Sequence, residues 1–132
     1  MKYMVTGAAG SIGSEMCRQV LEFSPGELIL VDQWENGIFE MGNELRARDT
    51  GAVISYFIGD ICDRDRMRVI FDRKRPEVVF HAAAYKHVPL MEENPGEAVK
   101  NNVLGTKILA DLCNEIGSVE RFVMISTDKA VN

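Results

Sequence analysis

Residues 6–13 read TGAAGSIG, and they follow the short apolar run Tyr3-Met4-Val5. The glycines have the spacing GxxGxxG between an expected strand and an expected helix. In such a turn Gly7 allows the tight bend, Gly10 lets the backbone approach a phosphate, and Gly13 lets the helix pack closely on the strand. The N–H groups at the start of the helix then face the anion. The alternative is a glycine-rich turn without a ligand, but an acidic residue 19 positions after Gly13 favours dinucleotide binding.

Apolar runs alternate with amphipathic segments along the whole chain. The pattern predicts strands at residues 3–5, 28–31, 53–58, 78–80 and 121–125, and helices at residues 11–23, 35–49, 63–74 and 97–116. Such alternation is typical of α/β proteins with parallel strands and right-handed crossovers. We therefore predict a Rossmann-like, doubly wound parallel sheet of five strands in the order 3-2-1-4-5. Ligands of these sheets bind outside the carboxyl ends of the strands, near the point where the strand order reverses.

The composition indicates one globular domain and excludes several classes of protein. The chain has 132 residues, of which 46% are hydrophobic and 27% charged, and its net charge of −5 argues against a nucleic-acid-binding surface. No apolar run has the length of a membrane span, and the N-terminus does not resemble a signal peptide. The three cysteines lie 45 and 51 residues apart, without the spacing of a zinc site or a disulfide framework, which favours a reducing cytoplasm.

Asp32 ends the second predicted strand. A carboxylate there could accept hydrogen bonds from both ribose hydroxyls of NAD and repel the 2′-phosphate of NADP. No Lys or Arg follows before Arg46, so the sequence favours NAD over NADP. The alternative is that Asp32 caps the next helix. Trp34 is expected to shield apolar surface rather than to stack on adenine.

Further candidates follow the third and fourth predicted strands. Asp60 could accept from the adenine amino group while Ile61 packs on the ring, or Asp60 could be a helix cap. The small residues 82–84 leave room for a nicotinamide ring, and His81 before them is expected to be structural. Asn102 lies inside a predicted helix, where asparagine is mildly unfavourable, which suggests a polar role. The predicted cofactor contacts are Gly7, Ala9, Gly10, Ser11, Ile12, Gly13, Asp32, Asp60, Ile61, Ala82, Ala83, Ala84 and Asn102.

Two polar segments complete the expected site. Lys86 and His87 could meet an anionic substrate, or they could belong to a solvated loop. Residues 126–129, Ser-Thr-Asp-Lys, follow the fifth strand and bring together a hydroxyl, a carboxylate and an amine, which could act as hydrogen-bond donor, acid and base. A common Asp-Lys turn is the alternative.

Together these stretches resemble the extended short-chain dehydrogenase/reductase family, and within it the nucleotide-sugar 4,6-dehydratases of the capsular (CapD-like) group. The similarity spans nearly the whole chain, and it is most specific in YKHVPLME and STDKAVN, residues 85–92 and 126–132. The resemblance implies a UDP-N-acetylhexosamine substrate, most specifically UDP-N-acetylglucosamine. It also implies that residues 1–132 are the NAD-binding domain of an enzyme whose substrate-binding lobe lies beyond this sequence.

The resemblance further assigns catalytic roles. NAD would take hydride from sugar C4, Lys129 would remove the C5 proton, and Asp128 would protonate the departing C6 hydroxyl. Hydride would return to C6, while Thr127 bonds the C4 oxygen. The family also implies a homo-oligomer, a cytoplasmic active site and, in many relatives, membrane helices before this domain. An NAD-dependent sugar epimerase and a non-enzymatic NAD-binding module remain the alternatives.

Overall fold

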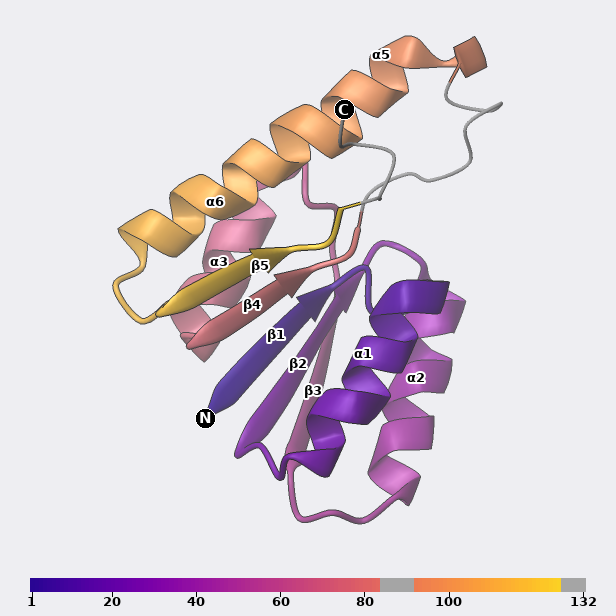
Figure 1. Cartoon of the computed structure of the whole chain (residues 1–132), viewed down its shortest axis with the longest axis vertical. Coiled ribbons are helices and arrows are strands. Elements are labelled where there is room, and N and C mark those ends of the chain that lie inside the picture. The colour runs from indigo at the N-terminus through magenta and orange to yellow at the C-terminus, as the bar shows by residue number, and fades with distance from the viewer. Residues whose placement is uncertain (84–91, 127–132) are drawn as a thin grey trace.

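The computed structural model of the chain describes residues 1–83 and 92–126 (Figure 1). Neighbouring strands of the sheet pair in parallel, and their order is β3-β2-β1-β4-β5. This confirms the predicted Rossmann-like topology. The strands are β1 (Lys2–Thr6), β2 (Glu27–Asp32), β3 (Val53–Ile58), β4 (Val78–His81) and β5 (Arg121–Met124).

Helices cover both faces of the sheet. Figure 1 shows α1 (Ser11–Glu22) and α2 (Glu35–Ala47) on one face, and α3 (Arg64–Lys74) and α6 (Thr106–Glu115) on the other. Each helix turns an apolar stripe inward, as the 3.6-residue period of the sequence predicts. The start of α3 is set locally, because the Asp63 carboxylate accepts a hydrogen bond of 3.0 Å from the Arg66 N–H.

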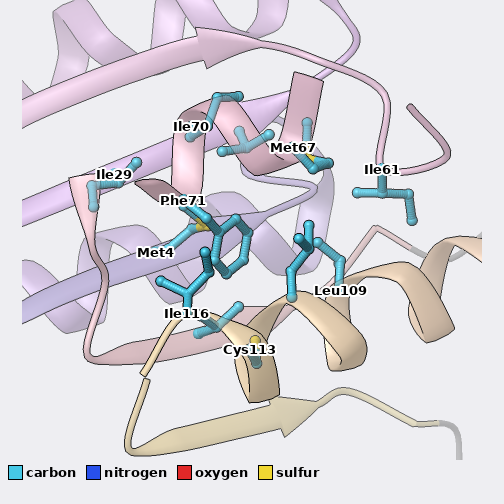
Figure 2. Packing of buried hydrophobic residues seen from close by; sticks show 12 residues of the cluster. Met4, Ile29, Ile61, Met67, Ile70, Phe71, Leu109, Cys113 and Ile116 are labelled. Carbon is cyan, nitrogen blue, oxygen red and sulfur yellow. The ribbon is translucent and has the colours of Figure 1, made fainter. Parts of the chain in front are cut away.

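The sheet separates two apolar clusters because successive strand residues point to opposite faces. In β1, Met4 packs toward α3 and α6, whereas Val5 packs toward α1 and α2. Figure 2 shows the first cluster, in which Phe71 and Leu109 lie against the strand residues. With both faces buried, the central strands read as continuous apolar runs, which is why they are evident in the sequence.

The predicted helix at residues 97–116 differs in detail from the observed one. In place of one regular helix the structure has three consecutive elements: α5 (Pro95–Ala98), a π-helical turn η1 (Val99–Gly105) and α6. The π-helical turn contains Asn101, Asn102 and Gly105, which are poor helix formers, so the regular hydrogen-bond pattern is weakest there. Single π-turns inside helices are frequent at functional sites.

Three further features concern membrane-spanning helices, metal ligands and the cysteines. Within residues 1–83 and 92–126, no helix is both long and apolar enough to cross a bilayer. The same part of the chain contains no group of three His, Cys, Asp or Glu side chains that could bind a metal. Cys17, Cys62 and Cys113 are free thiols, and burial raises the pKa of Cys17 and of Cys113 to about 12, so both stay protonated.

Candidate functional site

A cleft opens where the first four strands of the sequence end. It lies at the reversal of strand order between β1 and β4, where ligands of doubly wound sheets bind. Many of the predicted cofactor contacts meet in this cleft, although they come from four separate loops. Its walls are formed by Gly7, Gly10, Val31, Asp32, Gln33, Gly59, Asp60, Ile61, Ala82 and Ala83.

The glycine turn is held by contacts between backbone atoms. Gly7 has φ of +72°, a conformation that favours glycine, and its N–H donates to the Val31 carbonyl at 2.9 Å. A Cβ at Gly7 would lie 2.4 Å from the Ala82 carbonyl oxygen, and one at Gly13 would lie 1.9 Å from the Gly7 oxygen. Gly10 is the N-cap residue of α1 and has no side chain with which to cap the helix. The first N–H groups of α1 suit an anion.

Asp32 is oriented by two backbone donors. One carboxylate oxygen accepts from the Ala9 N–H at 2.9 Å, and the other accepts from the Trp34 N–H at 3.0 Å. The N-cap of α2 is Trp34, so Asp32 does not cap that helix. The Trp34 ring packs over Gly37, where a Cβ would lie 2.3 Å from a ring carbon. The ring thus covers the start of α2 at Gly37, although Trp34 itself is largely exposed.

The loop after β3 forms the opposite wall of the cleft. The Asp60 carboxylate accepts from the Cys62 N–H at 2.9 Å, and Asp63, not Asp60, caps α3. Ile61 is 4% exposed and belongs both to the cleft wall and to the core. Burial raises the pKa of Cys62, with a smaller contribution from the nearby Asp60 charge, so this thiol is not an activated nucleophile.

His81 is buried and joins three elements behind the cleft. Its Nδ1 lies 2.8 Å from the Thr6 hydroxyl of β1, and its Nε2 lies 2.8 Å from the Thr106 hydroxyl of α6. Burial lowers the pKa of His81 to about 4, so the ring is neutral near pH 7. His81 is therefore structural, as expected, whereas no pattern in the sequence indicates its two threonine partners.

Asn101 is a buried polar residue that the sequence analysis did not select. Its side-chain amide donates to the Ala83 carbonyl at 2.8 Å and to the Asn102 side-chain oxygen at 3.0 Å. Asn101 is 5% exposed, and its hydrogen bond to Ala83 holds the start of the loop after β4 against η1. The pair of adjacent asparagines inside a predicted helix suggests a polar role at this place in the sequence. The structure shows that Asn101 is the one whose side chain reaches Ala83.

The remaining predicted residues are placed as follows. Ser11 and Ile12 start α1, and Ile12 is half exposed. The Ile125 N–H donates to the His81 carbonyl at 3.0 Å, so the chain reaches Ser126 at the same sheet edge as the cleft. The predicted residues that lie outside the described part of the chain are Ala84, Lys86, His87, Thr127, Asp128 and Lys129.

Known sequences similar to this chain include polysaccharide biosynthesis proteins. A family model described as "Polysaccharide biosynthesis protein" matches residues 3–132. The chain is 52% identical to the "Probable polysaccharide biosynthesis protein EpsC" of Bacillus subtilis and 50% identical to the "Capsular polysaccharide biosynthesis protein CapD" of Staphylococcus aureus, covering 98% of this chain and 22% of each relative. It is 37% identical to a "UDP-N-acetylglucosamine 4,6-dehydratase (inverting)" of Campylobacter jejuni, over 98% of this chain and 37% of that relative. The chain thus spans well under half the length of these relatives.

Solved structures with the same fold include nucleotide-sugar epimerases. A UDP-glucose-4-epimerase of Stenotrophomonas maltophila, "with bound NAD and formylated UDP-arabinopyranose", superposes with a TM-score of 0.85 at 29% identity, covering 98% of this chain and 38% of that one. A Thermus thermophilus UDP-glucose 4-epimerase "complex with NAD" has a TM-score of 0.83 at 30% identity, covering 96% and 38%.

Proposed function

The chain belongs to the polysaccharide biosynthesis protein family, and we propose that it forms the NAD-binding part of a UDP-N-acetylhexosamine 4,6-dehydratase. The observation that carries this proposal is the meeting of the glycine turn and the oriented Asp32 carboxylate in one cleft at the switch point of the sheet. The similarity to a UDP-N-acetylglucosamine 4,6-dehydratase supports the substrate class.

The residues of the cleft fit NAD. The uncapped start of α1 suits the pyrophosphate, and Gly10 lets the backbone approach it. The fixed orientation of Asp32 suits a pair of ribose hydroxyls. Among the described residues, no Lys or Arg forms an ion pair with Asp32, so its charge opposes a 2′-phosphate. Asp60 and Ile61 would contact adenine, the small residues 82–84 would leave space for nicotinamide, and Asn102 would lie near that end.

Each protein group has a defined task in this proposal. NAD, when bound, supplies the capacity to accept hydride from the sugar and to return it. Lys129 takes the C5 proton, Asp128 gives a proton to the departing C6 hydroxyl, and Thr127 donates a hydrogen bond to the C4 oxygen. Lys86 and His87 meet the anionic part of the substrate. The hydrogen bond from Ile125 to β4 supports these roles, because it brings the fifth strand to the cleft just before residue 127.

The test is product analysis of the full-length protein with UDP-N-acetylglucosamine in D₂O. We expect a 4-keto-6-deoxy sugar nucleotide with deuterium at C5. Lys129→Ala should abolish both the exchange at C5 and the product, because a lysine is then no longer present to remove the proton. Wild-type rates of exchange in this variant would exclude Lys129 as the base.

An epimerase is the second candidate, because the superposable NAD complexes are UDP-glucose 4-epimerases. An epimerase would return hydride to C4 and yield the C4 epimer without loss of water. The same experiment therefore separates the two reactions. Binding of NAD without any turnover of UDP-sugars would favour a non-enzymatic module.

A further inference from the structure

The π-helical turn η1 contacts two of the loops that line the cleft, those after β3 and β4. The Cys62 thiol donates to the Lys100 carbonyl at 3.3 Å, which ties the loop after β3 to η1. Asn101 holds Ala83, in the loop after β4, through the hydrogen bond of 2.8 Å. One short segment, far from the glycine turn in the sequence, thus makes hydrogen bonds with both loops.

Gly105, the last residue of η1, leaves no room for a side chain beside the loop that follows β3. A Cβ there would lie 2.5 Å from Cδ1 and 2.8 Å from Cγ1 of Ile61, and 3.4 Å from the Cys62 sulfur. Gly105 has φ of −61° and ψ of −43°, which are ordinary helical values that alanine adopts without strain. Glycine is therefore needed here for space alone.

An alanine at this position would displace Ile61 in one direction. On the core side, Ile61 packs in the cluster that contains Met67 and Leu109, each 0% exposed (Figure 2). Protein interiors are close-packed and resist added volume. The open side is the cleft, whose wall Ile61 helps to form. The side chain would therefore move into the space assigned to adenine.

We propose that Gly105 is a positioning residue for the adenine side of the cleft, because its missing side chain lets η1 seat Ile61 and Cys62 out of the way of the base. This inference rests on the proposed NAD-binding function. It predicts a selective defect, since the atoms nearest to a Cβ at Gly105 belong to Ile61 and Cys62 and not to the glycine turn that would hold the pyrophosphate.

The test compares two probes on the full-length protein by calorimetry: ADP, which carries the adenine, and nicotinamide mononucleotide, which lacks it. We expect Gly105→Ala to weaken ADP binding about tenfold, as a small overpacking penalty implies, with nicotinamide mononucleotide binding unchanged. Gly96→Ala is the matched control, because Gly96 is also helical and a Cβ there meets nothing within 4 Å. It should leave both affinities unchanged.

Rescue separates positioning from general damage. Ile61→Ala removes Cδ1 and Cγ1, the two atoms nearest to the added methyl group. Relative to Ile61→Ala alone, the added Gly105→Ala change should then cost no more than about threefold in ADP affinity. Any of three results would overturn the proposal. They are an equal loss of affinity for ADP and nicotinamide mononucleotide, an unchanged ADP affinity in Gly105→Ala, and no recovery of ADP affinity when residue 61 is shortened. If Gly105→Ala does not fold, the double variant must fold and bind ADP, or the proposal is wrong. Failure of the wild type to bind ADP or NAD would instead overturn the proposed function itself.

Discussion

The two ends of strand β2 each carry a carboxylate, and the two carboxylates have different kinds of hydrogen-bond partner. Glu27, the first residue, accepts hydrogen bonds of 2.6 Å from both Lys74 and Ser55, and Lys2 lies 3.8 Å away. Asp32, the last residue, is held by two backbone N–H groups. The charge of Glu27 is neutralised within the fold. The orientation of Asp32 is fixed while its charge stays available, which suits a residue that discriminates between ligands.

The same contrast extends across the sheet. At the amino end of β2, long side chains make the contacts, whereas at the carboxyl end the glycine turn and Asp32 depend on backbone atoms. Backbone atoms cannot move aside as a flexible side chain can. The carboxyl end should therefore be the less tolerant of added volume, and the amino end should respond more to loss of charge.

The largest effect is expected at Gly13. Gly13→Ala would place a methyl carbon 1.9 Å from the Gly7 carbonyl oxygen, so α1 or the turn must move. We expect a loss of at least about 3 kcal/mol in the free energy of unfolding, together with loss of NAD binding. Urea denaturation measures the first and calorimetry the second, with Gly96→Ala again as control. A Gly13→Ala protein of wild-type stability would show that the backbone end of the sheet can relax.

The next largest effect is expected from acid, through His81. The pKa of His81 is lowered from 6.5 to about 4 by burial, so the unfolded chain binds its proton more tightly than the folded one. Above pH 6.5 the neutral ring makes its full contribution to the free energy of unfolding. As the pH falls toward 4, the free energy of unfolding decreases by about 3 kcal/mol in total. An NMR titration of the His81 ring checks this. A folded-state pKa near 6.5 would contradict it.

A moderate effect is expected at the amino end of β2. Burial by itself would raise the pKa of Glu27, but the hydrogen bonds from Lys74 and Ser55 hold it below the ordinary value. Glu27→Gln keeps the shape and removes the charge, and it should cost about 2 kcal/mol at pH 7. Because the folded pKa is depressed, the difference from the wild type should shrink as the pH falls below 4.5. A difference independent of pH would mean that the charge of Glu27 does not stabilise the fold.

The smallest effect on stability is expected for the matching change at the other end of β2. Asp32→Asn should lower the free energy of unfolding by about 1 kcal/mol, because the amide replaces one of the two oxygens that accept from backbone N–H groups. The loss stays small because Asp32 is partly exposed and makes no ion pair in the described part of the chain. Cofactor preference should change instead, with NADP affinity rising relative to NAD by about tenfold. Calorimetry with both cofactors tests this. An unchanged ratio would remove Asp32 as the basis of NAD preference.

Much of the fold could be predicted from the sequence because its signals are local. The glycine turn needs particular backbone conformations within eight residues, and each strand or helix shows its period over a short window. The reversal of strand order follows from the turn and from the handedness of crossovers. Asp32 could be selected as well, because its distance from the turn is a property of one β-α-β unit.

The partners of the buried polar groups were decided by the tertiary structure alone. His81 meets Thr6 across 75 residues of chain, and Glu27 meets Lys74 across 47. No local pattern relates such residues, because their contact depends on which strands and helices become neighbours. The π-turn is a similar case: it shifts the helical phase, so that Asn101 reaches Ala83 and Gly105 reaches Ile61. A regular 3.6-residue period cannot foresee these contacts, since each joins η1 to a residue far away in the sequence.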